Sequence, residues 1–206
     1  MAELRRHLVV MVRAPRLGTV KRRLARDVGD LAALRFYRGH TAGLLGELAC
    51  DPRWIAWLAV TPDAAARDPR GLWRFDGPVL AQGEGDLGRR MGHILSTLPP
   101  GPAVIVGSDV PGITRRRAWR AFQALGAHDW VFGPAEDGGY WLVGARRRPA
   151  LRLPFSGVRW STPDALADTL ANLPDGKVAF VERLGDVDRG ADFRRLYAAA
   201  SSRTAR

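Results

Sequence analysis

Short apolar stretches alternate with helical patterns along this chain, and this alternation limits the possible folds more than any other feature. The stretches have the continuous, β-branched apolar character of strands that are buried on both faces. They are Leu8–Val12, Trp54–Val60, Ala103–Gly107, Trp130–Gly133 and Trp141–Gly144, with a weaker candidate at Val178–Val181. Strands that alternate with helices favour a mostly parallel sheet covered on both sides. We therefore predict an α/β fold with three layers, α/β/α.

Helical patterns with recognisable start signals lie between these stretches. Thr162 followed by Pro163 is typical of an N-cap and a first helical position. The expected helices are Asp30 to about Leu48, Asp86–Leu95, a helix capped by Thr114, Thr162 to about Leu173, and Ala191–Tyr197. No internal repeat or linker interrupts the series, so we expect one domain over residues 1–206.

The composition indicates a folded protein without a membrane segment. Apolar residues make up 46% of the 206 residues and charged residues 26%, which is typical of a globular chain. No apolar run reaches the roughly 18 residues that a membrane span needs, and Met1–Met11 is interpreted as the first strand and not as a signal peptide. The single cysteine, Cys50, permits no internal disulfide. We expect a cytoplasmic protein with no membrane partner.

The net charge of +11 raises the question of nucleic-acid binding. Arginine supplies all 32 basic residues except Lys21 and Lys177, and this imbalance is typical of a biased genome composition. The triplets Arg115–Arg117 and Arg146–Arg148 have no interleaved aromatic residues on which bases could stack. We therefore do not expect a nucleic-acid partner.

A basic, glycine-containing loop follows the first predicted strand. Gly18 would let the backbone approach an anion, and cations around it would neutralise the charge. The cations are Arg13, Arg16, Lys21, Arg22 and Arg23. The segment matches neither the Walker pattern nor the dinucleotide G-x-G-x-x-G fingerprint. A phosphate site and a solvated basic loop both remain open for this segment taken alone.

Acidic residues follow two later strands. Asp109 comes directly after a buried strand, where its carboxylate could bind Mg²⁺ or Mn²⁺, although it could instead cap the next helix. Glu136 and Asp137 precede a Gly-Gly pair, which could form a simple hairpin turn. A hairpin needs no second acid, so we favour a functional loop. Its acids could complete a metal site, or accept hydrogen bonds from an acceptor hydroxyl group, or act as a base.

Two further segments carry weaker signals. Gln82–Met91 contains three glycines before a helix and could hold a base or a ribose, or only connect two elements. In Gly185–Asp188, a late aspartate could reach the metal or cap the last helix.

Together and in this order, these segments resemble a family with the glycosyltransferase-A (GT-A) fold. It is a bacterial family known as arsenosugar-biosynthesis glycosyltransferases or radical-SAM/selenodomain-associated transferases. The resemblance spans Val10 to about Leu196, and the Gly-Pro-x-Glu-Asp-Gly-Gly-Tyr run is its most specific part. Its segments are Pro15–Leu24, Gly85–Met91, Gly107–Gly112, Gly133–Tyr140, Trp160–Thr162 and Asp186–Asp188. More distantly, the chain is similar to phospholactate and molybdenum-cofactor guanylyltransferases.

The resemblance implies a nucleotide-diphospho-sugar transferase fold with a nucleotide-binding first half and an acceptor-binding second half. The implied partners are a nucleoside-diphosphate sugar or an NTP, a small-molecule acceptor, and Mg²⁺ or Mn²⁺. The implied nucleotide-binding residues are Arg13, Gly18, Lys21, Arg23, Gly88, Arg90 and Ser108. The implied metal ligands are Asp109, Asp137 and Asp188; the catalytic residues are Asp109, Glu136 and Asp137; and the acceptor side is lined by Gly138, Gly139 and Tyr140.

Three activities stay open at this point. The first is glycosyl transfer from a nucleoside-diphosphate sugar, and the second is nucleotidyl transfer that releases pyrophosphate. The third is nucleotide binding without catalysis. The chain also departs from the family pattern, with Arg22 in place of the usual threonine and Arg89 in place of a common acid. Leu17 replaces the second proline of the first loop, and Arg13 replaces its opening lysine. Of these changes, Arg22 and Arg89 add positive charge beside the expected phosphate site.

Overall fold

The computed structural model describes residues 4–68, 73–147, 152–187 and 189–195. The strands are β1 (His7–Arg13), β2 (Ile55–Thr61), β3 (Val79–Ala81), β4 (Ala103–Gly107), β5 (Trp130–Pro134), β6 (Tyr140–Ala145) and β7 (Val178–Phe180). The helices are α1 (Arg22–Val28), α2 (Asp30–Ala49), α3 (Asp63–Arg67), α4 (Leu87–Thr97), α5 (Arg115–Ala124) and α6 (Ala165–Ala171). Residues 190–195 are also helical.

The strands form one mixed sheet in the order β3-β2-β1-β4-β6-β5-β7. β1 is parallel to β2 and β4, β2 to β3, and β5 to β7, whereas β6 is antiparallel to both of its neighbours. All strands except β6 therefore end at the same edge. The loops after β1, β3, β4, β5 and β7 meet at this carboxyl edge, where ligands bind in open α/β sheets.

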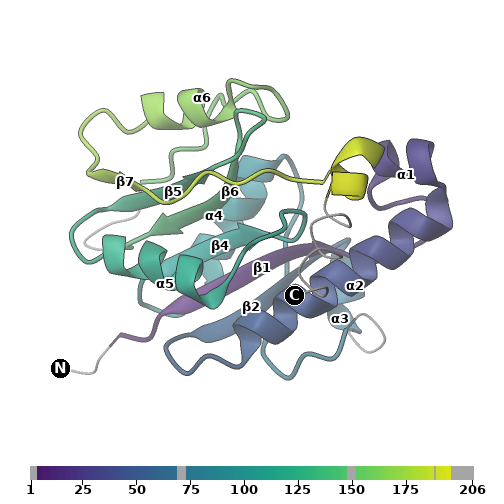
Figure 1. Cartoon of the computed structure of the whole chain (residues 1–206). Helices are drawn as coiled ribbons and strands as arrows, with labels where there is room; N and C mark the ends of the chain where they lie inside the picture. Colours follow the sequence, from purple (N-terminus) through teal and green to yellow (C-terminus); the bar gives the residue numbers. More distant parts are fainter. Residues whose placement is uncertain (1–3, 69–72, 148–151, 188, 196–206) are drawn as a thin grey trace, which may run out of the picture.

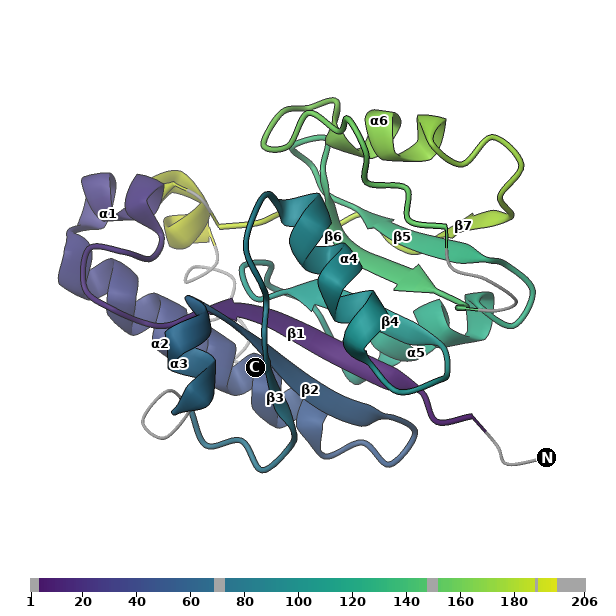
Figure 2. The same cartoon turned by 180° about the vertical axis from the view of Figure 1, so that it is seen from behind.

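Helices cover both faces of the sheet, which gives three layers. Figure 1 is viewed from the side of α2 and α5, and Figure 2 from the side of α4. Leu45 and Leu48 of α2 pack with Val10 of β1 in one buried cluster. On the other face, α4 packs against alternate strand residues such as Val9, which is the period-two pattern of a strand buried on both sides. The predicted mostly parallel, three-layer α/β fold is confirmed.

The segment after β7 crosses the carboxyl edge to reach α1 and α2 (Figure 1). Val187 and Phe193 belong to a small apolar cluster with Leu24 of α1 and Phe36 of α2. Gly190 N donates a hydrogen bond of 2.8 Å to the side chain of Asp27 in α1. The end of the described chain is thus tied to the loop and helix that follow β1.

Most predicted elements are present, and one predicted helix start is wrong. Asp86 and Thr114 cap α4 and α5 through hydrogen bonds from Arg89 N and Arg117 N. Helix α6, however, begins at Ala165 with Asp164 as its N-cap. Thr162 Oγ1 is engaged in a turn, since it donates to the Arg159 carbonyl at 2.7 Å. The last predicted helix is present as far as residue 195, and its final residues lie outside the described part of the chain.

Three short elements were not predicted: α1, α3 and β3. They span seven, five and three residues, too few for a hydrophobic period to appear. As for membrane insertion, none of the helices in the described ranges has both the length and the apolar character of a bilayer-spanning segment.

Candidate functional site

Two adjoining cavities open at the carboxyl edge of the sheet. The first has a volume of about 350 Å³ and lies between the ends of β1, β2 and β4 and the start of α4. The second has a volume of about 490 Å³ and lies between α1, the β5–β6 loop and residues 160–165. Six residues line both cavities: Lys21, Leu87, Gly107, Asp109, Tyr140 and Trp141. The two cavities therefore form one continuous site with a shared wall.

An ion pair lies at the junction of the cavities. Lys21 Nζ is 3.5 Å from Asp109 Oδ2, and the Lys21 side chain is 3% exposed whereas that of Asp109 is 53% exposed. Lys21 has a left-handed backbone (φ 48°), which is uncommon for a residue with a side chain, and it precedes α1 directly. The predicted phosphate-binding cation and the predicted metal ligand are thus in contact.

A histidine from α2 lies near this ion pair. Burial lowers the pKa of His40, and the charges of Asp109 and Lys21 act on it in opposite directions. His40 is therefore neutral at pH 7. It stacks on Phe36 with ring centroids 5.6 Å apart.

The predicted nucleotide-binding residues separate into three groups. Arg13, Lys21, Arg90 and Ser108 line the first cavity, whereas Arg23 lines only the second. Gly18 and Gly88 line neither of the two cavities.

The two glycines have different surroundings. Gly18 has positive φ (73°) and open space where a Cβ atom would lie, so it shapes the turn after β1. Gly88 is a packing position, because a Cβ atom there would be 2.7 Å from Phe155 Cβ and from Trp160 Cζ2.

The β5–β6 loop, in which the acceptor-binding residues were predicted, forms one wall of the second cavity. Asp137, Gly139 and Tyr140 line the second cavity. Asp137 Oδ1 accepts a hydrogen bond of 3.0 Å from Gly139 N, which leaves Oδ2 available. Gly138 has positive φ (87°), and a Cβ atom on it would overlap the backbone of Pro163. This glycine allows the loop to touch residues 160–165, the opposite wall of the cavity.

Glu136 is directed away from both cavities. The side chain is exposed and lies against the segment after β7, where a Cβ atom on Gly185 would be 2.8 Å from Glu136 Oε2. Its backbone N donates to Leu184 O at 3.1 Å. Of the two adjacent acids, only Asp137 borders the site.

Tyr140 presents its ring to the cavities, and its hydroxyl group is buried. Burial raises the pKa of Tyr140, whose hydroxyl lies on the side of Thr169 in α6. The ring makes edge contacts with Phe132 and Trp160, at centroid distances of 5.2 Å and 6.2 Å. Trp141 and Trp160 also line the second cavity.

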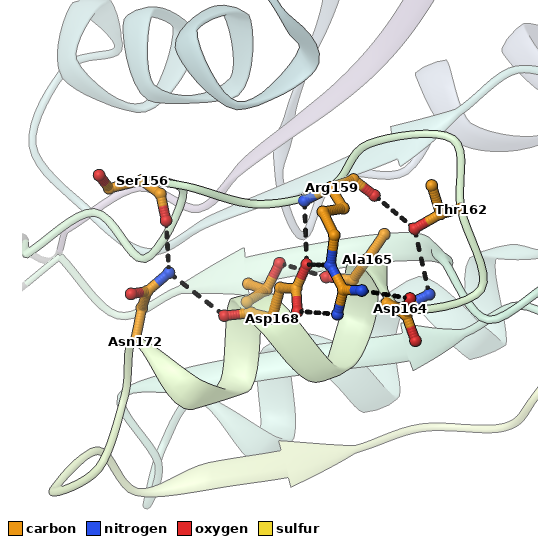
Figure 3. Close-up of polar contacts among 8 residues, drawn as sticks. Ser156, Arg159, Thr162, Asp164, Ala165, Asp168 and Asn172 are labelled. Atoms are coloured by element: carbon orange, nitrogen blue, oxygen red, sulfur yellow. Dashed lines mark hydrogen bonds and ion pairs between the residues drawn. The ribbon is translucent and has the colours of Figure 1, made fainter.

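The far wall of the second cavity is held in place by a cluster of polar contacts around one arginine, Arg159 (Figure 3). Arg159 binds Asp168 through Nε (2.9 Å) and Nη2 (2.8 Å), and it forms an ion pair with Asp164 at 2.8 Å. These hydrogen bonds lower the pKa of Asp168 to about 2. The cluster holds Trp160 and Thr162, which follow Arg159 and face the cavity.

Asn172 anchors the beginning of the same loop. Its Nδ2 donates to Ser156 O at 2.8 Å and to Asp168 O at 3.2 Å (Figure 3). Residues 156–164 are therefore tied to α6 at both ends. Sequence reasoning did not identify this clamp, because the separations of its partners range from four to sixteen residues and follow no regular period.

The carboxylates fit a divalent ion that arrives together with phosphate oxygens. Asp109, Asp137 and Asp186 line the second cavity, but within the described ranges no three His, Cys, Asp or Glu side chains gather closely enough to enclose a metal. Asp188 lies outside the described residues. Mg²⁺ is usually bound by one or two carboxylates plus substrate phosphates, which agrees with this sparse arrangement.

Gln82 and Tyr37 line the first cavity. Gln82 begins the segment that could hold a base or a ribose or only connect two elements, whereas Tyr37 was not predicted as a site residue. Gln82 Nε2 donates to Val12 O at 2.9 Å and to Ala59 O at 2.8 Å. Only the amide nitrogen can lie between two carbonyl oxygens, so the side-chain oxygen is the group presented to the cavity. Gln82 directly follows β3, and the signal in the sequence was the glycine-containing segment that it begins, Gln82–Met91.

Comparison with known proteins gives one family and a set of similar structures. The profile of a family described as "Uncharacterized protein conserved in bacteria (DUF2064)" matches residues 44–162, more than half of the chain. No match was found among curated proteins.

One similar structure is a protein from Desulfovibrio desulfuricans G20 that is named provisionally as a nucleotide-diphospho-sugar transferase. It is 29% identical, with a TM-score of 0.86, over 93% of this chain and 86% of that chain. More distant structures share the fold. CMP:2-keto-3-deoxy-manno-octonic acid synthetase in complex with CTP has a TM-score of 0.57 at 14% identity, over 97% of this chain and 99% of that one. Glucosyl-3-phosphoglycerate synthase from Mycobacterium tuberculosis, in complex with Mn²⁺, UDP and glucosyl-3-phosphoglycerate, has a TM-score of 0.55 at 11% identity, over 94% and 76%.

Proposed function

This chain belongs to the bacterial protein family DUF2064, and from this membership and the site geometry we propose that it is a metal-dependent transferase that uses a nucleotide-activated donor. The donor that we favour is a nucleoside-diphosphate sugar. The observation that carries the proposal is the Lys21–Asp109 ion pair at the junction of two cavities on the carboxyl edge of the sheet. The similarity to the Desulfovibrio protein supports it. We further propose that residues 1–206 act as one domain with a nucleotide half and an acceptor half.

In this proposal the nucleotide occupies the first cavity. A volume of about 350 Å³ lies within the range of small-ligand sites. The Gln82 side-chain oxygen would accept a hydrogen bond from an N–H group of the base. Arg13 and Arg90 would contact phosphate oxygens, with the Ser108 hydroxyl group beside them. The diphosphate would then end at the junction, near Lys21.

The leaving diphosphate is stabilised by charge at the junction. Asp109, with Asp137 as the second carboxylate and Asp188 in reserve, would hold Mg²⁺ or Mn²⁺. When bound, such an ion neutralises negative charge on the departing diphosphate. Lys21 and Arg23 would move toward the same oxygens, so that the positive charge is strongest where negative charge develops.

The acceptor would bind in the second cavity. Asp137 Oδ2 is available to accept a hydrogen bond from an acceptor hydroxyl group and so direct its oxygen toward the donor. The rings of Tyr140 and Trp160 would pack against the acceptor. Arg22 lines this cavity and makes no ion pair with another described residue, so an acceptor that carries a carboxylate or phosphate group would be favoured. Glycosyl transfer by the arsenosugar-biosynthesis family, which the sequence resembles, would be one example of a transfer to such an acceptor.

Nucleotidyl transfer is the second candidate. It is favoured by the likeness to a CTP-bound synthetase over 97% of this chain and by the basic loop after β1, which could accommodate a triphosphate. In that reaction an acceptor oxygen attacks the α-phosphate and pyrophosphate leaves. In glycosyl transfer a nucleoside diphosphate leaves.

The leaving group provides the test. Purified protein would be incubated with Mn²⁺ and each of UDP-, GDP-, ADP- and dTDP-sugars, and separately with each NTP, together with a mixture of small hydroxyl-bearing acceptors. Release of a nucleoside diphosphate from one sugar donor supports the glycosyltransferase. Release of pyrophosphate from one NTP moves the assignment to nucleotidyl transfer. Failure of every nucleotide to bind or react would contradict both.

A further inference from the structure

Strand β4 ends before its neighbour β1 does, and the side chain of one tyrosine takes the place of the missing strand partner. β4 ends at Gly107, which is paired with Met11, whereas β1 continues to Arg13. The backbone N–H and C=O groups of Arg13 therefore face the side of β4 without a strand partner. The hydroxyl group of Tyr37, from α2, satisfies both: it accepts from Arg13 N at 2.8 Å and donates to Arg13 O at 3.0 Å.

The same hydroxyl group also reaches the end of β4. Tyr37 Oη lies 3.3 Å from Ser108 Oγ. Because the Tyr37 hydrogen is directed to Arg13 O, Ser108 supplies the hydrogen in this contact. Ser108 is adjacent to Asp109 in the chain, so one buried oxygen atom joins the start of the basic loop to the residue before the predicted metal ligand.

The position of this oxygen atom is rigid. Tyr37 is 3% exposed, and its ring makes an edge contact with Trp73 at 6.0 Å. Leu44, Leu45 and Leu48 of the same helix are buried in the core against the sheet. Burial raises the pKa of Tyr37 to about 12, so the hydroxyl group keeps its proton throughout the physiological range.

We propose that Tyr37 is a positioning residue that sets the separation between the phosphate-binding loop after β1 and Asp109. This inference rests on the proposed function. Tyr37 acts through Asp109, whose carboxylate has to lie at a defined distance from the phosphates to share a metal ion with them. Loss of the hydroxyl group would let the ends of β1 and β4 shift relative to each other, whereas the ring would preserve the packing of α2.

The test is a double-mutant cycle between Tyr37→Phe and Asp109→Asn. The dissociation constants of UDP, GDP, CDP and ADP would be measured by calorimetry with Mn²⁺ and with EDTA, and the nucleotide that binds wild type most tightly would be used. We expect Tyr37→Phe to weaken Mn²⁺-dependent binding about tenfold. With EDTA, or in the Asp109→Asn background, Tyr37→Phe should weaken nucleotide binding by less than about threefold.

Two other variants keep the test decisive. Ser108→Ala removes the second partner of the same oxygen, so its effect on Mn²⁺-dependent binding should not add fully to that of Tyr37→Phe. Thr169→Val removes another buried hydroxyl group, which donates to Ala165 O at 2.7 Å in α6. It should lower the melting temperature without a change in nucleotide affinity.

The outcomes separate this inference from the proposed function. If wild type binds a nucleotide with Mn²⁺ and Tyr37→Phe binds equally well, or loses as much affinity with EDTA as with Mn²⁺, the positioning role is wrong and the proposed function stands. If wild type binds none of the four nucleotides with or without Mn²⁺, the proposed function fails, and this inference fails with it.

Discussion

At the scale of single residues, the loops around this site contain glycines that are required for different physical reasons. Gly138 needs both its positive φ and the absence of a Cβ atom, because the Pro163 backbone lies against it. Gly157 also has positive φ (69°), but no atom lies within 4 Å of the place where a Cβ would be. Alanine substitutions at Gly138 and Gly157 therefore separate the cost of steric overlap from the cost of backbone strain.

We expect Gly138→Ala to lower the free energy of unfolding by about 3 kcal/mol or more, since strain and overlap add. Gly157→Ala should cost only about 1 kcal/mol, from strain alone. Urea denaturation of the two variants measures both values. Equal losses would show that Pro163 can move away and that the loop is not fixed against residues 160–165.

In the proposed function, the polar group that would contact the base in the first cavity belongs to Gln82. Its amide nitrogen is held by Val12 O and Ala59 O, so the side-chain oxygen acts as an acceptor. Nucleotides that are methylated at the base N–H, such as 3-methyluridine or 1-methylguanosine diphosphates, should therefore bind at least about tenfold more weakly than their parents.

The ratio of the two dissociation constants is the measurement, because it cancels general losses of stability. Gln82→Met has a similar size and removes the acceptor oxygen, so its ratio should fall toward one. A wild-type ratio near one would contradict base recognition by Gln82.

At the scale of elements, residues 156–164 form a wall that is held by charge more than by burial. The Arg159 guanidinium group holds the pKa of Asp168 at about 2, below the ordinary value of about 3.9 that the unfolded chain has. A carboxyl group with a lowered pKa stabilises the folded state above its unfolded pKa. That stability is lost as the pH falls from about 4 toward 2.

We therefore expect Asp168→Asn to be less stable than wild type at pH 7, with a difference that disappears near pH 2. Melting temperatures across this range would show it. Asp175→Asn, which removes an exposed carboxylate outside the cluster, is the charge-matched control. A difference that persists unchanged at pH 2 would mean that Asp168 acts by packing and not by its ion pair.

The sequence allowed the main elements to be predicted but not the contacts between them. The buried strands were recognisable because each is apolar on both faces, and Asp86 and Thr114 marked the helices that they cap. The role of Tyr37 depends on β4 ending two residues before β1 in register, and no local pattern encodes this. The start of α6 was wrong because Thr162 takes part in a turn with Arg159.

At the scale of the whole molecule, the sheet brings distant parts of the chain to one edge. The predicted phosphate loop and Asp109 are almost ninety residues apart, yet Lys21 and Asp109 are in contact. This meeting follows from the strand order, in which β1 lies beside β4. The residues after both strands were predictable as site candidates, since carboxyl ends of parallel strands share an edge. Glu136, which belongs to the same loop as Asp137, shows that such reasoning identifies the loop and not the direction of each side chain.

Metal-dependent nucleotide binding is the central claim, and comparison of wild type with Asp109→Asn tests it most directly. Thermal shifts would be recorded with nucleoside-diphosphate sugars and NTPs, each with Mn²⁺, Mg²⁺ or EDTA, because a ligand of the native state raises the melting temperature. We predict a shift for wild type that requires both a nucleotide and a metal. Asp109→Asn should lose this shift while still unfolding cooperatively, with a lower unliganded melting temperature because the buried Lys21 ammonium group loses its carboxylate partner. Each shift is therefore measured from the variant's own unliganded melting temperature. An equal metal-dependent shift in the variant would contradict the account.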